Sequence, residues 1–297
     1  MTSPVAGIAP VVDGGPTRRR GRGWLLLVPG LLWLAIFFVF PTVQLFFTSL
    51  YDPSGSYERG YSMTWEVQNY VDAVQSTWNL FARSFAYAGI ATLICLVLAY
   101  PLAYAIAFKA GRWRNVMLVL VIAPFFTSFL LRTLSWRTIL ADRGPVTSFL
   151  RDIGILEADG RLLATSVAVI AGLVYNFLPF MTLPIYASLD KVDPTLVEAA
   201  GDLYSSPFTG FRTVTWRLSL PGVVAGTLLT FIPASGDYIN AQLLGTPQQY
   251  MVGNRIQSAF LTERNYPLAA SLSLLLMVIV VVMVVAYVRR SGTEDLV

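Results

Sequence analysis

The sequence predicts an all-α integral membrane protein with six transmembrane helices and cytoplasmic termini. Hydrophobic residues make up 55% of the chain and charged residues only 13%, whereas a soluble domain carries about a quarter charged residues. The mean hydropathy is +0.61. Long uncharged windows recur along the chain, and a bilayer core requires about 20 apolar helical residues.

Six windows are long enough, or nearly long enough, to cross a bilayer. They are residues 23–51, 84–108, 115–131, 162–189, 218–236 and 265–288. The third window is the shortest, and we expect it to extend past Arg132 with that side chain reaching toward the interface. Residues 238–254 are also uncharged, but their Asn, Gln and Gly content argues against a seventh span.

The distribution of basic residues favours a cytoplasmic N-terminus. Of the 21 lysines and arginines, 12 fall on the same side as the N-terminus and 9 on the other side. Cytoplasmic loops are enriched in Lys and Arg, and the first helix usually dominates the orientation. Residues 18–22 are basic and precede an apolar run too long for a cleaved signal peptide, so we interpret them as part of a signal anchor.

These features divide the chain into four parts. We predict a disordered basic tail at 1–22, a first transmembrane helix with a long outer loop at 23–83, a core of five transmembrane helices at 84–288, and a cytoplasmic tail at 289–297. Aromatic residues in the outer loop are typical of an interfacial belt, and a docking surface for an external partner is the alternative. These residues are Tyr51, Tyr57, Tyr61, Trp65, Tyr70 and Trp78.

Composition also excludes several kinds of site. Histidine is absent and Cys95 is the only cysteine, so neither a disulfide framework nor a Cys/His metal site can form. Cys95 lies in an apolar run and is predicted to be a small buried side chain. The basic residues lie at segment ends, as expected for contact with lipid, and they predict no nucleic-acid partner.

Prolines and glycines distinguish the fifth window from the sixth. Helix breakers are tolerated at membrane depth where the backbone is buried or lines a cavity, so we expect the fifth window to line a pathway. The sixth, rich in Leu, Val, Ile and Met, is predicted to face lipid. Residues 146–150 follow a turn signal and predict a short interfacial helix. The breakers in the fifth window are Pro221, Gly222, Gly226, Pro233 and Gly236.

A polar stretch between the fourth and fifth windows predicts a helix, a turn and a second helix. Asp193 before Pro194 combines an oxygen cap with proline at the first helical position. Leu196, Ala200 and Leu203 follow at helical spacing and form one apolar stripe.

The first helix of this stretch has two further features. Glu198 and Asp202 lie on a different face from the apolar stripe, and small residues beginning at Ala199 leave room for another protein to approach. Ser206 and Pro207 repeat the cap-proline signal and begin the second helix. The residues alone leave a docking surface and an ordinary solvated loop equally open.

This stretch resembles the coupling motif of ABC importer permeases. In that family Glu-Ala-Ala is followed three residues later by Gly and then by a hydrophobic-Leu-Pro element. Glu198-Ala199-Ala200 matches, as do Asp202-Leu203, Ser206-Pro207, Phe211-Arg212, Val214-Thr215 and Leu220-Pro221-Gly222. Two positions depart, because Tyr204 stands at the family's glycine and Trp216-Arg217 at its first Leu-Pro.

Three further stretches resemble the spermidine/putrescine branch of this family, and in particular the first of its two permease subunits. They are residues 124–136, residues 236–245, and residues 251–257 with 265–273. The resemblance implies a multi-pass protein of the cell membrane. It also implies a second, different permease subunit, two ATP-binding cassette ATPase subunits and an extracytoplasmic substrate-binding protein as partners, with membrane lipid around them.

The resemblance also implies roles for particular residues. The ATPase-coupling residues would be Leu196, Glu198, Ala199, Ala200, Gly201, Asp202 and Leu203. The chain has no Gly-rich phosphate loop with Lys and Ser/Thr, so we predict a non-catalytic subunit with no cofactor, no metal and no catalytic residue. Its partners would hydrolyse the ATP.

A polyamine is a flexible polycation, so its pathway needs carboxylates and aromatic faces. Asp237 and Tyr238 supply both, with Asn240 and Trp136 as further pathway candidates. Asp237 could instead be a water-exposed residue at a helix end or turn. Tyr175 and Asn176 are weaker candidates. Two alternative functions remain: the same permease role for an anion or sugar, and an ATP-independent carrier.

Overall fold

The computed structural model describes residues 23–56, 58–203 and 206–291, and the chain forms two compact units, Met1–Leu45 and Phe46–Val297. Regular structure in the described residues is helical, with only two isolated β-bridges. Five helices are long and apolar enough to cross a membrane, or six if one bent pair counts as a single span. The all-helical prediction is confirmed, and the predicted six spans lie within this range.

The first unit is a single apolar helical segment. It comprises α1 (Gly23–Leu34), the π-helical turn η1 (Ala35–Val39) and the start of α2 (Phe40–Ser49), within which the division between the units falls. Residues Leu27–Ser49 qualify as a membrane span. The predicted basic tail at 1–22 lies outside the described residues, as does most of the predicted tail at 289–297.

The second long helix starts earlier than the sequence windows suggest. The helix α3 (Gln68–Tyr104) continues into η2 (Ala105–Lys109), so much of the predicted outer loop is helical. Ala73 and Phe81 in this extension are buried and pack with Val252 and Leu272. Its polar residues hid it from a search for uncharged windows, while its apolar face provides the packing.

Tyrosines of the predicted outer loop, one in the remaining loop and one at the start of α3, contact other parts of the second unit. The Tyr61 hydroxyl donates to the backbone oxygen of Arg264 at 2.5 Å, and its ring lies 5.8 Å from that of Tyr266. Tyr70 shares a hydrogen bond of 2.5 Å with the Ser49 hydroxyl. At least two of the loop aromatics therefore hold the chain together internally, whichever role the others have.

The third predicted span is bent instead of straight. A 3-10 turn η3 (Gly111–Trp113) leads into α4 (Arg114–Ile122) and η4 (Ala123–Phe126), and α5 (Phe129–Ile139) follows at 97°. Ser128 is extended, with φ −57° and ψ 135°, so the helix breaks there. The guanidinium of Arg132 lies over the Phe125 and Phe129 rings, at 5.9 and 5.8 Å from their centroids. As expected, helix continues past Arg132 to Ile139, but it does so after a sharp bend.

The predicted interfacial helix and the helix–turn–helix stretch are both helical. The former is α6 (Pro145–Asp152) and the latter begins with α8 (Pro194–Leu203), which follows α7 (Ser166–Leu189). The second helix of that stretch is not separate from the fifth window. Short α9 (Pro207–Gly210), the π turn η5 (Phe211–Thr215) and α10 (Trp216–Ser235) form one continuous span, Phe208–Ser235, despite Pro221.

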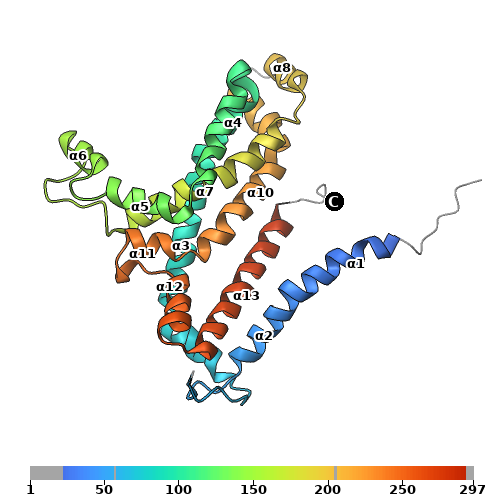
Figure 1. Ribbon diagram of the computed structural model, residues 1–297. Coiled ribbons are helices and arrows are strands. Elements are labelled where there is room, and N and C mark those ends of the chain that lie inside the picture. The colour runs from blue at the N-terminus through green and yellow to red at the C-terminus, as the bar shows by residue number, and fades with distance from the viewer. Residues whose placement is uncertain (1–22, 57, 204–205, 292–297) are drawn as a thin grey trace, which may run out of the picture. The chain divides into compact units, whose positions relative to one another are not determined.

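Helices α3, α7 and α10 pack side by side and form the centre of the second unit (Figure 1). Small side chains on α3, including the buried Cys95, allow α7 to approach closely. A Cβ on Gly222 would lie 2.5 Å from the Pro184 oxygen, and one on Gly226 would lie 2.9 Å from the Met181 sulfur. These two glycines therefore serve close packing of α10 on α7.

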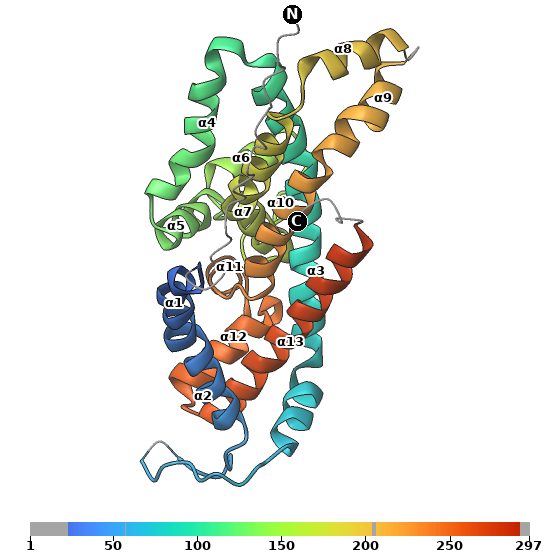
Figure 2. The same cartoon turned by 90° about the vertical axis from the view of Figure 1, so that its right-hand side faces the viewer.

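Short helices connect α10 to the last span. They are α11 (Ile239–Leu244), η6 (Pro247–Gln249), α12 (Val252–Gln257) and η7 (Ser258–Thr262), which precede α13 (Tyr266–Arg290). As predicted, residues 238–254 contain no span. Helix α13 runs beside α3 (Figure 2). It is not purely a lipid-facing wall, because Leu272 and Leu274 near its start are buried.

Candidate functional site

The exposed helix α8 stands at one end of the second unit, beside the start of α10 (Figure 1). Asp193 caps it, because its Oδ1 accepts the Thr195 N–H at 2.9 Å, and this bond holds the pKa of Asp193 below its usual value. Leu203 is 80% exposed and Leu196 is 49% exposed. The apolar stripe is therefore largely uncovered within the chain. Tyr204 and the side chains of Glu198 and Ala200 lie outside what the structure describes.

A groove of about 600 Å³ lies behind α8. Leu196 lines it together with Ser188 at the end of α7 and with Leu218 and Pro221 on α10. Both Lys191 and Asp193 also line this groove, so its lining is part polar and part apolar. The start of α8 therefore shares a groove with the end of α7 and the beginning of α10.

A second contact ties the start of α4 to the same region. Arg114 donates from Nε to the Tyr186 hydroxyl at 2.7 Å, and its guanidinium lies 5.2 Å from the Tyr186 ring centroid. The same guanidinium forms an ion pair with Asp190, the residue that follows α7. We call these three residues the α4–α7 clasp. It joins the bent third span to the segment that leads into α8.

The predicted pathway residues Asp237, Tyr238 and Asn240 lie at the other end of α10. Asp237 is 8% exposed and its Oδ1 accepts the Asn240 N–H at 2.8 Å, so it caps α11. Asn254 holds the same turn by donating to the Tyr238 oxygen at 2.9 Å. Burial raises the pKa of Asp237 to about 6, against the opposing effect of the hydrogen bond from the Asn240 N–H. The alternative of a water-exposed turn residue is wrong, because Asp237 is at a helix end but buried.

Asn176 connects this turn to Trp136. Its Nδ2 donates to Asn240 Oδ1 at 3.1 Å and to Thr133 Oγ1 at 3.2 Å. Thr133 and Trp136 lie one turn apart on α5, and the Trp136 ring is 5.3 Å from that of Tyr175. Hydrogen bonds therefore join Asp237 and Asn240 to α7 and α5. Trp136 lies beside this network through its ring contact with Tyr175, and Tyr238 takes part in the turn through its backbone oxygen.

Sequence reasoning missed Thr133 and underrated Asn176. Both are buried, at 0% and 1% exposure. Thr133 lies at i−3 from Trp136, a spacing that places two residues on one face of a helix, and this spacing was the available signal. Asn176 Oδ1 and Asn240 Nδ2 have no hydrogen-bond partner among the described residues, so this buried network has spare polar capacity.

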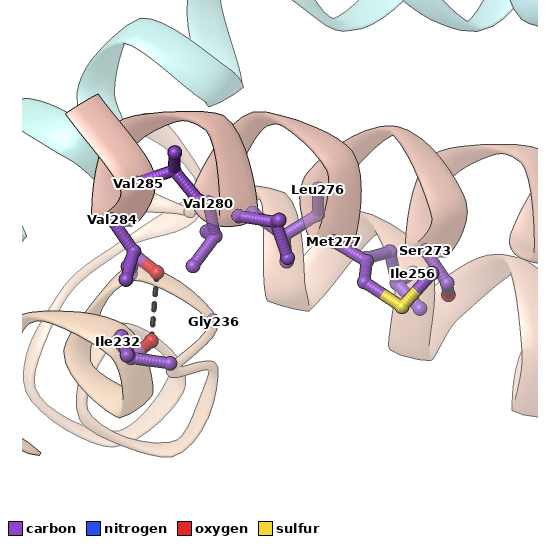
Figure 3. Close-up of a pocket in the computed structure, with 11 residues that line it drawn as sticks. Ile232, Gly236, Ile256, Ser273, Leu276, Met277, Val280, Val284 and Val285 are labelled. Carbon is purple, nitrogen blue, oxygen red and sulfur yellow. Dashed lines mark hydrogen bonds between the residues drawn. The ribbon is translucent and has the colours of Figure 1, made fainter. Parts of the chain in front are cut away.

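The largely apolar groove between α10 and α13 lacks the chemistry for a cation. Its volume is about 440 Å³, and Ile232, Leu276, Met277 and Val280 line it with only serines as polar side chains (Figure 3). No carboxylate lines this groove, so we do not assign it to a polycation. Within the described ranges, no group of His, Cys, Asp or Glu side chains could hold a metal ion.

Comparison with known proteins relates this architecture to a family. No protein-family model matches the chain. The spermidine/putrescine transport system permease protein PotB of Haemophilus influenzae is 37% identical over 86% of this chain and 90% of its own length. The chain belongs to the PotB family of ABC importer permeases. The Escherichia coli PotB is 35% identical, covering 87% of this chain and 94% of that protein.

Other relatives and solved structures agree with this membership. The inner membrane ABC transporter permease protein YdcU of Escherichia coli is 31% identical over 74% of both chains. A bacterial ABC transporter for alginate import, solved with its alginate-bound periplasmic protein, has a chain with TM-score 0.68 at 19% identity. The match covers 92% of this chain and 95% of that one. The same fold is seen in a second alginate transporter structure, with TM-score 0.64 at 17% identity.

Family membership fixes the broad role. As a PotB-family permease, the chain is a non-catalytic, multi-pass membrane subunit, and its partners hydrolyse the ATP. The resemblance found in the sequence is therefore confirmed at the level of the family.

Proposed function

We propose that this chain forms half of a pathway through which spermidine or putrescine enters the cell. This proposal rests on the PotB relatives, whose names describe permeases of spermidine/putrescine transport systems. The network around Asp237 supports it with suitable chemistry. An ammonium needs an acceptor or an aromatic face, and the network supplies the Asp237 carboxylate, the free Asn176 oxygen and the Trp136–Tyr175 ring pair.

Substrate would reach this network from an extracytoplasmic binding protein. Asp237, Tyr238 and Asn240 follow the end of α10 farthest from α8, so they would face the outer half of the membrane if α8 is cytoplasmic. Both termini would then be cytoplasmic, in agreement with the distribution of basic residues. A second, different permease subunit would supply the other half of the pathway.

Two ATPase subunits would hydrolyse ATP, and their movement would reach this chain through α8. The exposed Leu196 and Leu203 would pack in a groove of the ATPase, with Glu198 and Asp202 making polar contacts and Ala199, Ala200 and Gly201 allowing close approach. The groove behind α8 and the α4–α7 clasp would carry the movement to α7, α10 and α4. The substrate network joins α7 to α5, which follows α4, so coupling and substrate contact share the same helices.

The substrate assignment is tested by uptake in cells that carry the whole transporter. Labelled putrescine is supplied with an excess of unlabelled spermidine, putrescine, an anionic sugar or a neutral sugar. We expect both polyamines to compete and neither sugar to do so. Absence of transporter-dependent putrescine uptake, or uptake that excess unlabelled spermidine fails to reduce, would contradict the polyamine assignment while leaving the permease role intact. Uptake by this chain without its ATPase would indicate an ATP-independent carrier.

A further inference from the structure

The face of the helix that leads into α10 carries two arginines that the transport cycle above does not use. A groove of about 460 Å³ lies along this face, lined by Thr209, Arg212, Thr213, Trp216 and Arg217, with an apolar residue at each end. Both arginines are exposed, and neither forms an ion pair or hydrogen bond with any other described residue. The groove therefore presents two positive charges beside hydroxyl groups and an aromatic ring.

A π turn brings the two arginines together. In a regular α-helix, residues five positions apart point in clearly different directions. Here the Trp216 N–H donates to the Phe211 oxygen, five residues earlier, which widens the turn between Arg212 and Arg217. Such turns occur frequently at functional sites. The wide turn rotates Arg217 back toward Arg212, so that both line one groove.

The turn is fixed from its other side. The Tyr100 ring of α3 lies 5.1 Å from the Trp216 ring and 5.6 Å from the Phe211 ring. Tyr100 is itself buried and shares a hydrogen bond of 2.8 Å with the Ser219 hydroxyl. This packing anchors Phe211 and Trp216 inward, and Arg212 is left on the outward face of a rigid turn.

The surroundings make the two charges unusual. No Asp or Glu occurs between Asp202 and Asp237. Helix α8 approaches η5 and carries the exposed Asp202, but no ion pair joins it to the groove arginines among the described residues. A bound anion would compensate the two positive charges.

We propose that this groove binds the headgroup phosphate of an anionic phospholipid. Guanidinium groups pair with phosphate oxygens through two parallel N–H donors, and Thr209 and Thr213 add hydroxyl donors. The groove lies at the start of the span Phe208–Ser235, where headgroups meet an interfacial tryptophan. Leu220 lies farther into the span than the arginines and matches the glycerol and acyl portion of a lipid, which a free phosphate ion lacks.

The inference needs this helix to span the membrane, but it is independent of the substrate and of ATPase docking. The test uses the full transporter purified in neutral detergent and measures binding of a fluorescent phosphatidylglycerol, with fluorescent phosphatidylcholine as the reference lipid. We expect Arg212→Gln with Arg217→Gln to weaken phosphatidylglycerol binding roughly 30-fold, since each basic group near a membrane surface contributes about a factor of five. Phosphatidylcholine binding should not change.

Matched variants separate this site from general charge effects. Arg289→Gln with Arg290→Gln removes the same charge from exposed positions at the end of α13, and it should leave phosphatidylglycerol binding unchanged. Arg212→Lys with Arg217→Lys keeps the charge but loses the paired donors, and it should bind more weakly than the wild type and more strongly than the glutamine variant. This variant also provides the test if the glutamine variant does not fold.

Three results would overturn the proposal. One is equal binding of phosphatidylglycerol by the wild type, the glutamine variant and the lysine variant. Another is complete displacement of the lipid by millimolar inorganic phosphate, which would indicate a free-anion site. The third is loss of the ATPase subunit from the purified glutamine variant with lipid binding unchanged, which would assign the groove to an acidic surface of the ATPase. Loss of substrate-stimulated ATP hydrolysis with unchanged lipid binding would count against the proposed function and not against the lipid site.

Discussion

Replacing Asp237 with Asn should weaken polyamine uptake without unfolding the protein. The amide oxygen of Asn can still accept the Asn240 N–H, so the cap on α11 remains and only the charge is lost. Among the described residues, Asp237 accepts through Oδ1 alone, which leaves Oδ2 for an ammonium. The substitution therefore separates the charge of Asp237 from its structural role.

The size of the effect follows from the burial of the carboxylate. Two unit charges 4 Å apart attract by about 4 kcal/mol at an effective dielectric constant of about 20, and the ammonium must lose water to approach. Measured hydrogen bonds to charged groups contribute about 1.5–3 kcal/mol. A loss of about 2 kcal/mol corresponds to a KM for uptake raised roughly 30-fold.

The pH profile provides a second readout. With a pKa of about 6, Asp237 is about nine-tenths ionised at pH 7 and about one-tenth ionised at pH 5. Uptake by the wild type should therefore weaken as the pH falls through 6, and the Asn variant should not show this step. Because the folded pKa exceeds the ordinary 3.8, burial of this group costs stability as the pH rises toward 6. Removing the charge should not destabilise the protein at pH 7.

The assay is initial-rate uptake of labelled putrescine into proteoliposomes that contain the whole transporter, at pH 5, 6 and 7. Thermal unfolding of each variant is the control. Glu157→Gln removes a carboxylate from the exposed loop before α7 and should change neither KM nor the pH profile. An unchanged KM for Asp237→Asn, with the low-pH step retained, would refute a contact between this carboxylate and substrate.

Three further variants test packing and coupling. Gly222→Ala would bring a Cβ to 2.5 Å from the Pro184 oxygen and should cost about 1–3 kcal/mol of unfolding free energy. The control, Gly89→Ala, places its Cβ in open space and should not lower the melting temperature. Asn176→Leu leaves the buried Asn240 Oδ1 without its donor, while Thr133 keeps its bond to the Phe129 oxygen, and it should cost about 1–3 kcal/mol as measured by denaturation in detergent. Arg114→Ala should lower stability only slightly, because its ion pair is partly exposed, but it should reduce the ratio of transport to ATP hydrolysis. An unchanged ratio would contradict the role given to the α4–α7 clasp.

Most spans could be predicted from apolar windows because lipid demands long uncharged helices. The start of α3 at Gln68 could not, because its polar residues interrupt the pattern while Ala73 and Phe81 pack on distant Val252 and Leu272. The 97° bend at Ser128 likewise depends on a local break that no hydropathy window records.

The candidate sites show the same division. The cap and apolar stripe of α8 could be derived from local spacing, and Asp237 stood out as a carboxylate next to an apolar window. Asn176 bridges Thr133 and Asn240, which are 43 and 64 positions away from it in the sequence. Only the packing of α5, α7 and α11 could reveal this bridge. Two glycines of α10, Gly222 and Gly226, lie against α7, a close contact that the sequence could not distinguish from a broken helix because both use the same residue type.

The most direct test of ATP-driven coupling through α8 is substrate-stimulated ATP hydrolysis in the reconstituted transporter. Glu198→Lys reverses a charge within α8, and Glu157→Lys makes the same change in the loop before α7, at the opposite end of that 24-residue helix. We predict that Glu198→Lys abolishes polyamine-stimulated hydrolysis and releases the ATPase during purification, while Glu157→Lys leaves docking and basal hydrolysis unchanged. Normal stimulation and normal co-purification of the ATPase with Glu198→Lys would contradict the account.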